Sequence, residues 1–570
     1  MTLRNQNFLA GVIVLSFAIL VAATFLTTDK GLALQTYQGP LDFWTQIPLL
    51  YVVLGVAALL VFLITPNVKN NSSFYFAMIF VVFGAYLVKL LLPYYIFDGL
   101  VHFDIFCHYP SVQMLVSGGI QLQGYLYWPN TFLLTDMFEK VTETIFPLST
   151  SLTVVLAEIT LALLLFGFVK RLFGHREAIL SLLLLTIVEP VSLHWCPFTF
   201  SLTVIFVSFV ALFYGILRSD KRFTIIGIIA ALSSILYHAF NPIILALMCV
   251  VGVSCFTLLS KFSLIKVKVS FSNVYFILAL IIGTISWWLY VSFTVFWNFT
   301  TILSSLLMNE MRPYSYMSVV SSQPELVNQL KFMNILSYCT LFILILPVIP
   351  VLLWALHLML QKKLDVKHIK ILFLASVTIT MELIFFFLKL IEQNGFSQRF
   401  FFIGNMLLVL LSAVCIFELT RKRKLKKMIY ILFAVLFITV VVISPITNLS
   451  DYGAVNLISV TRTDEKTAAF AATYSIEGQS IEGDLRLLEI VEFFRWPDLL
   501  PFSFQFESNI ESGSFTYSSP ETEIVVSHTT SAFVTVQGIN DLEAANYIDG
   551  LYNNSNLVYS NSYNTVFVSR

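Results

Sequence analysis

Long uninterrupted apolar runs are the feature that most constrains how this chain can fold. A bilayer core of roughly 30 Å needs about 20 mostly apolar residues in one helix. Only 12% of the 570 residues are charged and 58% are hydrophobic, against about 25% charged in ordinary globular domains. The sequence therefore predicts a polytopic α-helical membrane protein. The thirteen candidate membrane helices are Phe8–Leu26, Ile47–Ile64, Phe74–Leu92, Leu148–Phe168, Ala178–Trp195, Phe198–Leu217, Phe223–Tyr237, Ile243–Leu259, Val274–Phe296, Ile335–Leu356, Ile371–Leu390, Phe400–Phe417 and Ile429–Ile443.

The distribution of basic residues predicts the orientation, because Lys and Arg collect in cytoplasmic loops. With the N-terminus inside, the cytoplasmic segments hold 21 of the 33 basic residues, and the short external loops hold five. The stretches 223–237 and 243–259, joined by "HAFNP", could form one broken helix. Merging them would place the run "RKRKLKK" outside, against the charge rule. We therefore expect a multi-pass protein of the cell membrane with a cytoplasmic N-terminus and an extracytoplasmic C-terminus.

The composition divides the chain into three regions. Residues 1–73 carry two N-terminal helices, residues 74–447 form a membrane core with a long external loop at 93–147, and residues 448–570 form a separate C-terminal domain. From Asn448 onward there are 16 Asp or Glu and five Lys or Arg. The segment "DEKTAAFAATYSI" has a helical pattern, and "TEIVVS", "AFVTVQ" and "NTVFVS" alternate like strands. We expect an extracytoplasmic α+β domain whose acidity argues against nucleic acid as a partner.

The external loop concentrates groups that can do chemistry. Asp98, His102, Asp104 and His108 lie within eleven residues, directly after an apolar run. Two amphipathic pieces are expected near 104–116 and 131–145, and the connector between them is rich in Gly and aromatic residues. In a helix, Asp104 and His108 would be i,i+4 neighbours on one face. The loop is therefore expected to lie along the outer membrane surface.

These features together resemble a known family. An apolar helix leading into a long external loop with an early Asp, two short surface helices, the segment "YWP", and a helix pair joined by the basic turn "KRLFGHRE" look like the GT-C superfamily of membrane glycosyltransferases. That superfamily uses polyprenyl-phosphate-linked sugars and includes the oligosaccharyltransferase, protein O-mannosyltransferase and aminoarabinose transferase families. The likeness continues at "SQRFFFIGNMLLVLL", similar to an Arg-led helix start late in the membrane part of the family.

The chain also departs from the family pattern. Its catalytic-type loop follows the third predicted helix, whereas in the family it follows the first. The tripeptide "DYG" at 451–453 lacks the two preceding Trp residues of the oligosaccharyltransferase peptide-recognition motif. Transfer to Asn of a glycosylation sequon is therefore not implied.

The resemblance implies a specific division of chemical roles. Sugar transfer from a lipid phosphate needs a base for the acceptor hydroxyl, and we expect Asp104 in this role, with Asp98 as the alternative. Positive groups must hold the phosphate as charge develops on it, and Arg can do so with two hydrogen bonds. The candidates for substrate or phosphate binding are His108, His102, Arg399, Arg312, His238, Tyr127 and Trp128.

Several alternatives stay open at this level. Asp104 and His108 could instead ligate a divalent metal such as Mg or Mn. Glu382 and Lys389 lie two turns apart on one predicted membrane helix, which would suit the ion pathway of a transporter or of a flippase for a lipid-linked glycan. A non-catalytic scaffold is the third class. For the transferase, the expected partners are membrane lipids, a polyprenyl-phosphate-linked hexose or pentose, and a glycan, lipid or protein acceptor.

Overall fold

The computed structural model describes most of the helical part of the chain and portions of its C-terminal region. The described residues are 3–28, 47–64, 72–96, 104–116, 128–188, 195–218, 220–262, 271–293, 296–297, 300, 335, 338–391, 396–420, 426–447, 462–474, 481–483, 487–488, 490–491, 494, 509–510, 522–527, 530, 541–560 and 564–569.

A helix overlaps every one of the apolar stretches expected from the sequence. Within the described residues, eight spans are long and apolar enough to cross a membrane, and three further apolar helices are shorter. The chain is thus a mostly helical, polytopic membrane protein, while the expected total of thirteen crossings stays a prediction. The helices are α1 (Leu3–Thr27), α4 (Pro48–Ile64), α5 (Ser72–Ile96), α9 (Leu148–Leu172), α10 (His175–Val188), α11 (Pro197–Arg218), α12 (Lys221–Ser234), α13 (Asn241–Phe262), α14 (Phe271–Tyr290), α18 (Val348–Leu360), α19 (Val366–Ile391), α20 (Phe396–Thr420) and α21 (Lys426–Thr447).

The expected helices at 223–237 and 243–259, which could have formed one broken helix, are two separate helices, α12 and α13. Asp220 caps the start of α12 by accepting a hydrogen bond from the backbone N–H of Arg222, which satisfies one of the free donors of a helix start. The helix ends before the turn at 235–240, and α13 begins at Asn241. A side chain at Gly227 would lie 2.7 Å from Leu212, so α11 and α12 approach each other closely.

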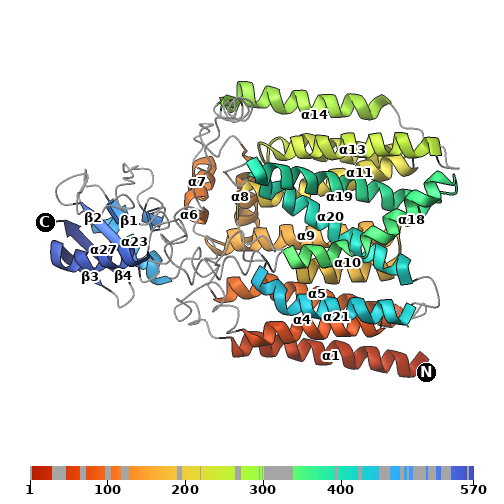
Figure 1. Cartoon of the computed structure of the whole chain (residues 1–570). Coiled ribbons are helices and arrows are strands. Elements are labelled where there is room, and N and C mark those ends of the chain that lie inside the picture. Colours follow the sequence, from red (N-terminus) through yellow and green to blue (C-terminus); the bar gives the residue numbers. More distant parts are fainter. Residues whose placement is uncertain are drawn as a thin grey trace.

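Three short helices lie across one end of the membrane bundle (Figure 1). They are α6 (Asp104–His108), α7 (Pro110–Val116) and α8 (Asn130–Thr142), and they occupy the two places where amphipathic surface helices were expected. The start of α1 and the turn between α18 and α19 lie at the opposite end (Figure 1). The candidate catalytic loop and the basic turns therefore belong to different ends of the bundle.

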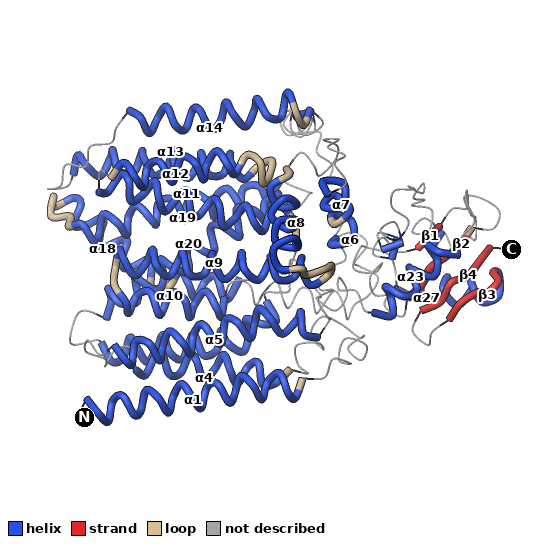
Figure 2. The backbone as a smooth tube through the Cα atoms, turned by 180° about the vertical axis from the view of Figure 1, so that it is seen from behind, coloured by secondary structure: helices blue, strands red, loops and turns tan. Residues whose placement is uncertain are grey.

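The C-terminal region contains a small mixed sheet beyond the end that carries α6 to α8 (Figure 2). Strand β1 (Ile481–Gly483) pairs in parallel with β2 (Glu523–Ser527), and the antiparallel strands β4 (Asn564–Ser569) and β3 (Ser555–Ser560) complete the order β1-β2-β4-β3. Helices α23 (Arg462–Tyr474) and α27 (Asp541–Asn554) accompany it. Asn564 donates a hydrogen bond of 2.9 Å to Asp464, which fastens α23 to β4.

The expected helix at 464–476 and the strands at 522–527 and 564–569 are present as α23, β2 and β4. Strands β1 and β3 and helix α27 were not expected. The strand expected in "AFVTVQ" and the domain boundary at 448 lie outside the described residues.

Candidate functional site

Four chain segments meet at the end of the bundle that carries α6 to α8. They are the residues just before α8, the start of α11, the turn at 235–240 and the start of α20. The backbone N–H of Asn130 donates to the carbonyl of Leu236 at 3.3 Å, which joins α8 to the turn. The buried Asn241 side chain donates to the hydroxyl of Ser201, which joins α13 to α11. This framework holds two nitrogen-bearing side chains, Arg399 and His238, close together.

Arg399 lies in the first turn of α20 and is held by two aromatic rings. Its Cζ atom lies 5.8 Å from the ring centroid of Phe198 and 5.4 Å from that of Phe240, within the range of cation–π attraction. Arg399 lies near the start of α20, where the helix dipole has its positive end. A bound anion would be attracted by both the guanidinium and the helix start.

His238 lies beside Arg399 in the turn between α12 and α13. Its Nδ1 accepts a hydrogen bond of 3.2 Å from the backbone N–H of Phe240, so in the neutral ring the proton sits on Nε2. Burial, and then the charge of Arg399, hold the pKa of His238 well below its ordinary value. His238 is therefore a neutral ring that offers one N–H donor.

Aromatic rings fix the orientation of this imidazole. Trp128 stacks on His238 with the centroids 6.3 Å apart and the planes 27° apart, and Phe198 meets the same ring edge-on at 5.7 Å. Three residues expected to bind substrate or phosphate, namely Arg399, His238 and Trp128, thus form one cluster. It combines a fixed cation and a neutral N–H donor with apolar walls, which suits an anion carried on an apolar molecule.

A second cluster surrounds His108 on the surface helices. The His108 side chain is only 4% exposed, and its ring centroid lies 6.4 Å from those of Phe132 and Trp195. The indole N–H of Trp195 donates to the hydroxyl of Thr135 at 3.1 Å. His108 is thus packed among aromatic rings between α6, α8 and the residues before α11, and any role for it in the reaction stays a prediction.

Glu139 links the surface helices to α9. It accepts hydrogen bonds from the hydroxyls of Tyr109, at 2.9 Å, and Ser149, at 2.5 Å. Burial, followed by this bond to Glu139, raises the pKa of Tyr109. The phenol is therefore a hydrogen-bond donor at neutral pH, and it pins the turn after α6 in place.

Other expected site residues fall outside what the structure describes. Asp104 is the first residue of α6, but its side chain is not among those described. The residues Asp98, His102, Arg312 and Tyr127 lie outside the described segments altogether. Among the described residues no group of three or more His, Cys, Asp or Glu side chains is placed to hold a metal ion. The proposed base and a metal at Asp104 and His108 therefore stay predictions.

The sequence reasoning missed the aromatic residues that hold the cluster. Phe198 follows Pro197, which opens α11 as proline often does at the first helical position, and Phe240 precedes α13. The motifs "WCPFTF" and "HAFNP" contain these residues, but a sequence with 54 Phe gives no sign of which ones face a cation.

Glu382 on α19 is a separate buried acid. Its side chain is 9% exposed, and neither carboxyl oxygen has a hydrogen-bond partner in the described part of the chain. It packs against Gly404 of α20, where a Cβ atom would lie 2.7 Å from Oε1. Gly404 is five residues beyond Arg399, about 7.5 Å deeper along the helix, so Glu382 lies below the cluster.

No protein-family model matches this chain, and no curated protein matches its sequence. Among solved structures, ArnT from Cupriavidus metallidurans in the apo state is 11% identical with a TM-score of 0.46, and the match covers 85% of this chain and 97% of that one. ArnT bound to undecaprenyl phosphate is 12% identical with a TM-score of 0.42, over 86% and 97% of the two chains.

The archaeal oligosaccharyltransferase AglB from Archaeoglobus fulgidus, in complex with an inhibitory peptide and a dolichol-phosphate, is 12% identical with a TM-score of 0.43, over 82% of this chain and 70% of that one. ArnT and AglB are thus two proteins of known structure to which this chain is similar, with TM-scores between 0.42 and 0.46.

Proposed function

We propose that this protein is a membrane glycosyltransferase that moves a sugar from a polyprenyl-phosphate-linked donor to an acceptor on the extracytoplasmic side. The observation that carries the proposal is the pairing of Arg399 with a neutral His238, walled by aromatic rings at the end of the bundle where α6 to α8 lie. A lipid-linked phosphate matches this site, because its phosphate is negatively charged and its lipid chain is apolar.

The cluster supplies what a departing phosphate needs. When the sugar leaves, negative charge develops on the phosphate, and preorganised donors aimed at it lower the barrier. The guanidinium of Arg399 can form two parallel hydrogen bonds to phosphate oxygens. The Nε2–H of His238 adds a neutral donor. Because the rings of Phe198 and Phe240 already hold Arg399, less side-chain entropy is lost when the phosphate binds.

An aspartate of the loop at 93–147 would act on the other substrate. We assign Asp104 as the base that accepts the proton of the acceptor hydroxyl, with Asp98 as the alternative. Asp104 opens α6, which lies with α7 and α8 at one end of the bundle (Figure 1). Arg399 contacts Phe198 and Phe240 at that same end. His108 of α6 packs against Trp195, and Trp195 lies three residues before Phe198. This packing links α6 to the cluster of Arg399, His238 and Trp128.

The remaining expected groups complete the proposal. Tyr127 would place a ring at the membrane interface beside Trp128, and Arg312 and His102 would add polar contacts to the donor. His108 would orient Asp104 or share a Mg or Mn ion with it. The donor would carry a hexose or a pentose, and the acceptor would be a glycan, a lipid or a protein.

The charge pattern supports the proposed orientation. The basic turns lie opposite the cluster, so with these turns in the cytoplasm the cluster and the C-terminal α+β domain face the exterior. The acidic domain, residues 448–570, would then sit beside the site and handle the acceptor.

Glu382 favours a second candidate, a transporter or flippase of a lipid-linked glycan. A buried carboxyl without a partner in the described part of the chain is a common feature of ion pathways in membranes. The two proposals differ in which residue matters most. A transferase depends on Asp104 or Asp98, and a transporter depends on Glu382.

The test is a transfer assay with purified protein and a radiolabelled polyprenyl-phosphate sugar. Asp104→Asn should lower the rate by about 10² to 10⁴, as expected for loss of a general base, and leave donor binding intact. Asp136→Asn is the matched control, because Asp136 is on the same loop but pairs with Lys140 at 2.8 Å. It should keep transfer. Full transfer activity in Asp104→Asn, Asp98→Asn and the double variant would refute the assignment of an Asp base. No transfer by the wild-type protein, together with lipid transport that depends strictly on Glu382, would refute the transferase proposal and favour transport.

A further inference from the structure

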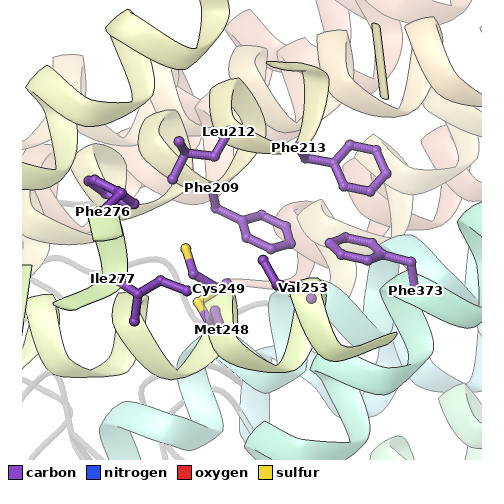
Figure 3. Close-up of a pocket in the computed structure, with 10 residues that line it drawn as sticks. Phe209, Leu212, Phe213, Met248, Cys249, Val253, Phe276, Ile277 and Phe373 are labelled. Carbon is purple, nitrogen blue, oxygen red and sulfur yellow. The ribbon is translucent and has the colours of Figure 1, made fainter. Parts of the chain in front are cut away.

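A partly open cavity lies between α11, α13, α14 and α19, away from the candidate site (Figure 3). The free space in it and at its open mouth, solvent included, totals about 380 Å³, so the enclosed cavity is smaller. Its lining is apolar throughout except for the thiol of Cys249. The residues that line it are Phe209, Leu212, Phe213, Met248, Cys249, Gly252, Val253, Phe276, Ile277 and Phe373.

One wall of the cavity is a rigid aromatic cluster. The ring of Phe373 lies 4.3 Å from that of Phe213 and 5.9 Å from that of Phe209, measured between centroids. Gly252 makes this packing possible, because a Cβ atom there would lie 2.7 Å from the Phe373 ring. The wall is thus fixed by packing between helices and does not depend on a ligand.

The opposite wall is one face of α14. Phe276 and Ile277 are 9% and 6% exposed, whereas Tyr275, Leu278 and Ile282 on the other faces are 69%, 49% and 61% exposed. In a membrane helix such exposed apolar side chains face lipid. The cavity therefore lies one helix away from the hydrocarbon of the bilayer.

The cavity is too far from Arg399 to be part of the candidate site. Phe198, which contacts Arg399, and Phe209 are eleven residues apart on α11, which is about 16 Å along the helix axis. Phe213 is about 22 Å from Phe198 by the same count. The cavity thus belongs to the half of the bundle that ends in the basic turns.

Positive charge lies at the nearer end of these helices. Lys221 and Arg222 in the first turn of α12 are both exposed, next to the capping Asp220. Gly227 on the same helix packs against the cavity residue Leu212. The five residues from Arg222 to Gly227 span about 7.5 Å, well within the length of an acyl chain, since one leaflet contributes roughly 15 Å of hydrocarbon.

We propose that this cavity takes one acyl chain of an anionic phospholipid from the leaflet on that side, with the phosphate of its headgroup at Lys221 and Arg222. The apolar lining selects hydrocarbon, and the two cations select negative charge. This inference does not rest on the proposed transferase activity. It requires only that the helices lie in a bilayer.

The test uses the full-length protein in nanodiscs with phosphatidylglycerol that carries a photoreactive diazirine near the end of one acyl chain. After irradiation, digestion and mass spectrometry, crosslinks should map to α13 and α14. Ile277→Phe fills part of the cavity and excludes roughly two methylene groups of the acyl chain from it. Labelling should therefore fall about tenfold. Leu278→Phe is the matched control on the exposed face and should label as the wild type does.

A second arm tests the headgroup and other occupants. Lys221→Gln and Arg222→Gln should each reduce the preference for phosphatidylglycerol over phosphatidylcholine about fivefold. Thermal midpoints show whether each variant is folded, and Phe276→Leu serves as a milder second change to the wall. Equal labelling of the Ile277→Phe and Leu278→Phe variants would overturn the inference. So would displacement of the probe by a polyprenyl phosphate, which would assign the cavity to the donor lipid.

Discussion

The replacement of Arg399 by Gln gives the sharpest test of the cluster geometry. The change keeps a side chain that can donate hydrogen bonds but removes the charge that the rings of Phe198 and Phe240 hold in place. A hydrogen bond to a charged group contributes about 1.5–3 kcal/mol, which corresponds to roughly 10- to 150-fold in affinity. Donor binding should weaken by that factor. The donor affinity of Arg399→Lys should lie between those of the wild type and Arg399→Gln, because Lys keeps the charge but lacks the planar guanidinium group.

His238 should contribute less, because the structure makes it neutral. A neutral hydrogen bond contributes about 0.5–1.5 kcal/mol, so His238→Ala should weaken donor binding by roughly 2- to 12-fold. Arg171→Gln is the matched control for Arg399→Gln. It also removes an Arg side chain that lies over an aromatic ring, that of Tyr214 at 5.8 Å, but at the opposite end of the bundle.

The pH dependence gives the result that would refute this reasoning. The pKa of His238 lies well below 6.5, so between pH 8 and 6 it gains no charge, and binding of a phosphodiester donor should not strengthen on its account. In Arg399→Gln the smaller of the two causes of the lowered pKa is gone, so the pKa of His238 rises. Protonation of His238, and the stronger donor binding that it brings, should therefore begin at a higher pH than in the wild type. Binding is measured by isothermal calorimetry in detergent. A wild-type protein whose binding strengthens with a midpoint near pH 6.5, with the effect abolished in His238→Gln, would contradict the assignment of a neutral ring.

Three further predictions concern packing and topology. Gly404→Ala should lower the thermal midpoint, because its Cβ would meet the carboxyl of Glu382 at 2.7 Å, and adding Glu382→Ala should restore it. Lys367→Met should cost about 1–3 kcal/mol by removing the ammonium that lies 2.6 Å from the Glu418 carboxylate; the further change Glu418→Gln should recover part of this loss in the same thermal assay. Reporter fusions should show a cytoplasmic location after Leu217, Leu259 and Lys427 and an external one after Arg570.

The sequence by itself determined where the helices lie. A helix overlaps every expected apolar stretch, because a chain in lipid must satisfy its backbone hydrogen bonds locally and the helix does so within each segment. The amphipathic pieces of the loop appear as α6, α7 and α8 for a similar local reason. Helix α23 and strands β2 and β4 were also predictable from short-range patterns. The short strand β1, and β3 with its exposed and irregular pattern, carried no such signal.

Arg399 was already a candidate from the sequence, because few basic residues fall in the predicted external loops. What the sequence could not show is that Arg399 lies beside His238 and that the imidazole stacks on Trp128. Nor could it show that His108 is packed among aromatic rings, or that Glu382 lies against a glycine.

These contacts depend on which faces of the helices meet, and only the tertiary structure decided that. In a soluble helix an apolar stripe marks the buried face. In a membrane the lipid is as apolar as the protein interior, so Phe, Leu and Ile on all sides give no such mark. The faces of α11, α13 and α20 that form the candidate site and the cavity are set by close packing at residues such as Gly227, Gly252 and Gly404, and that packing involves partners far away in the chain.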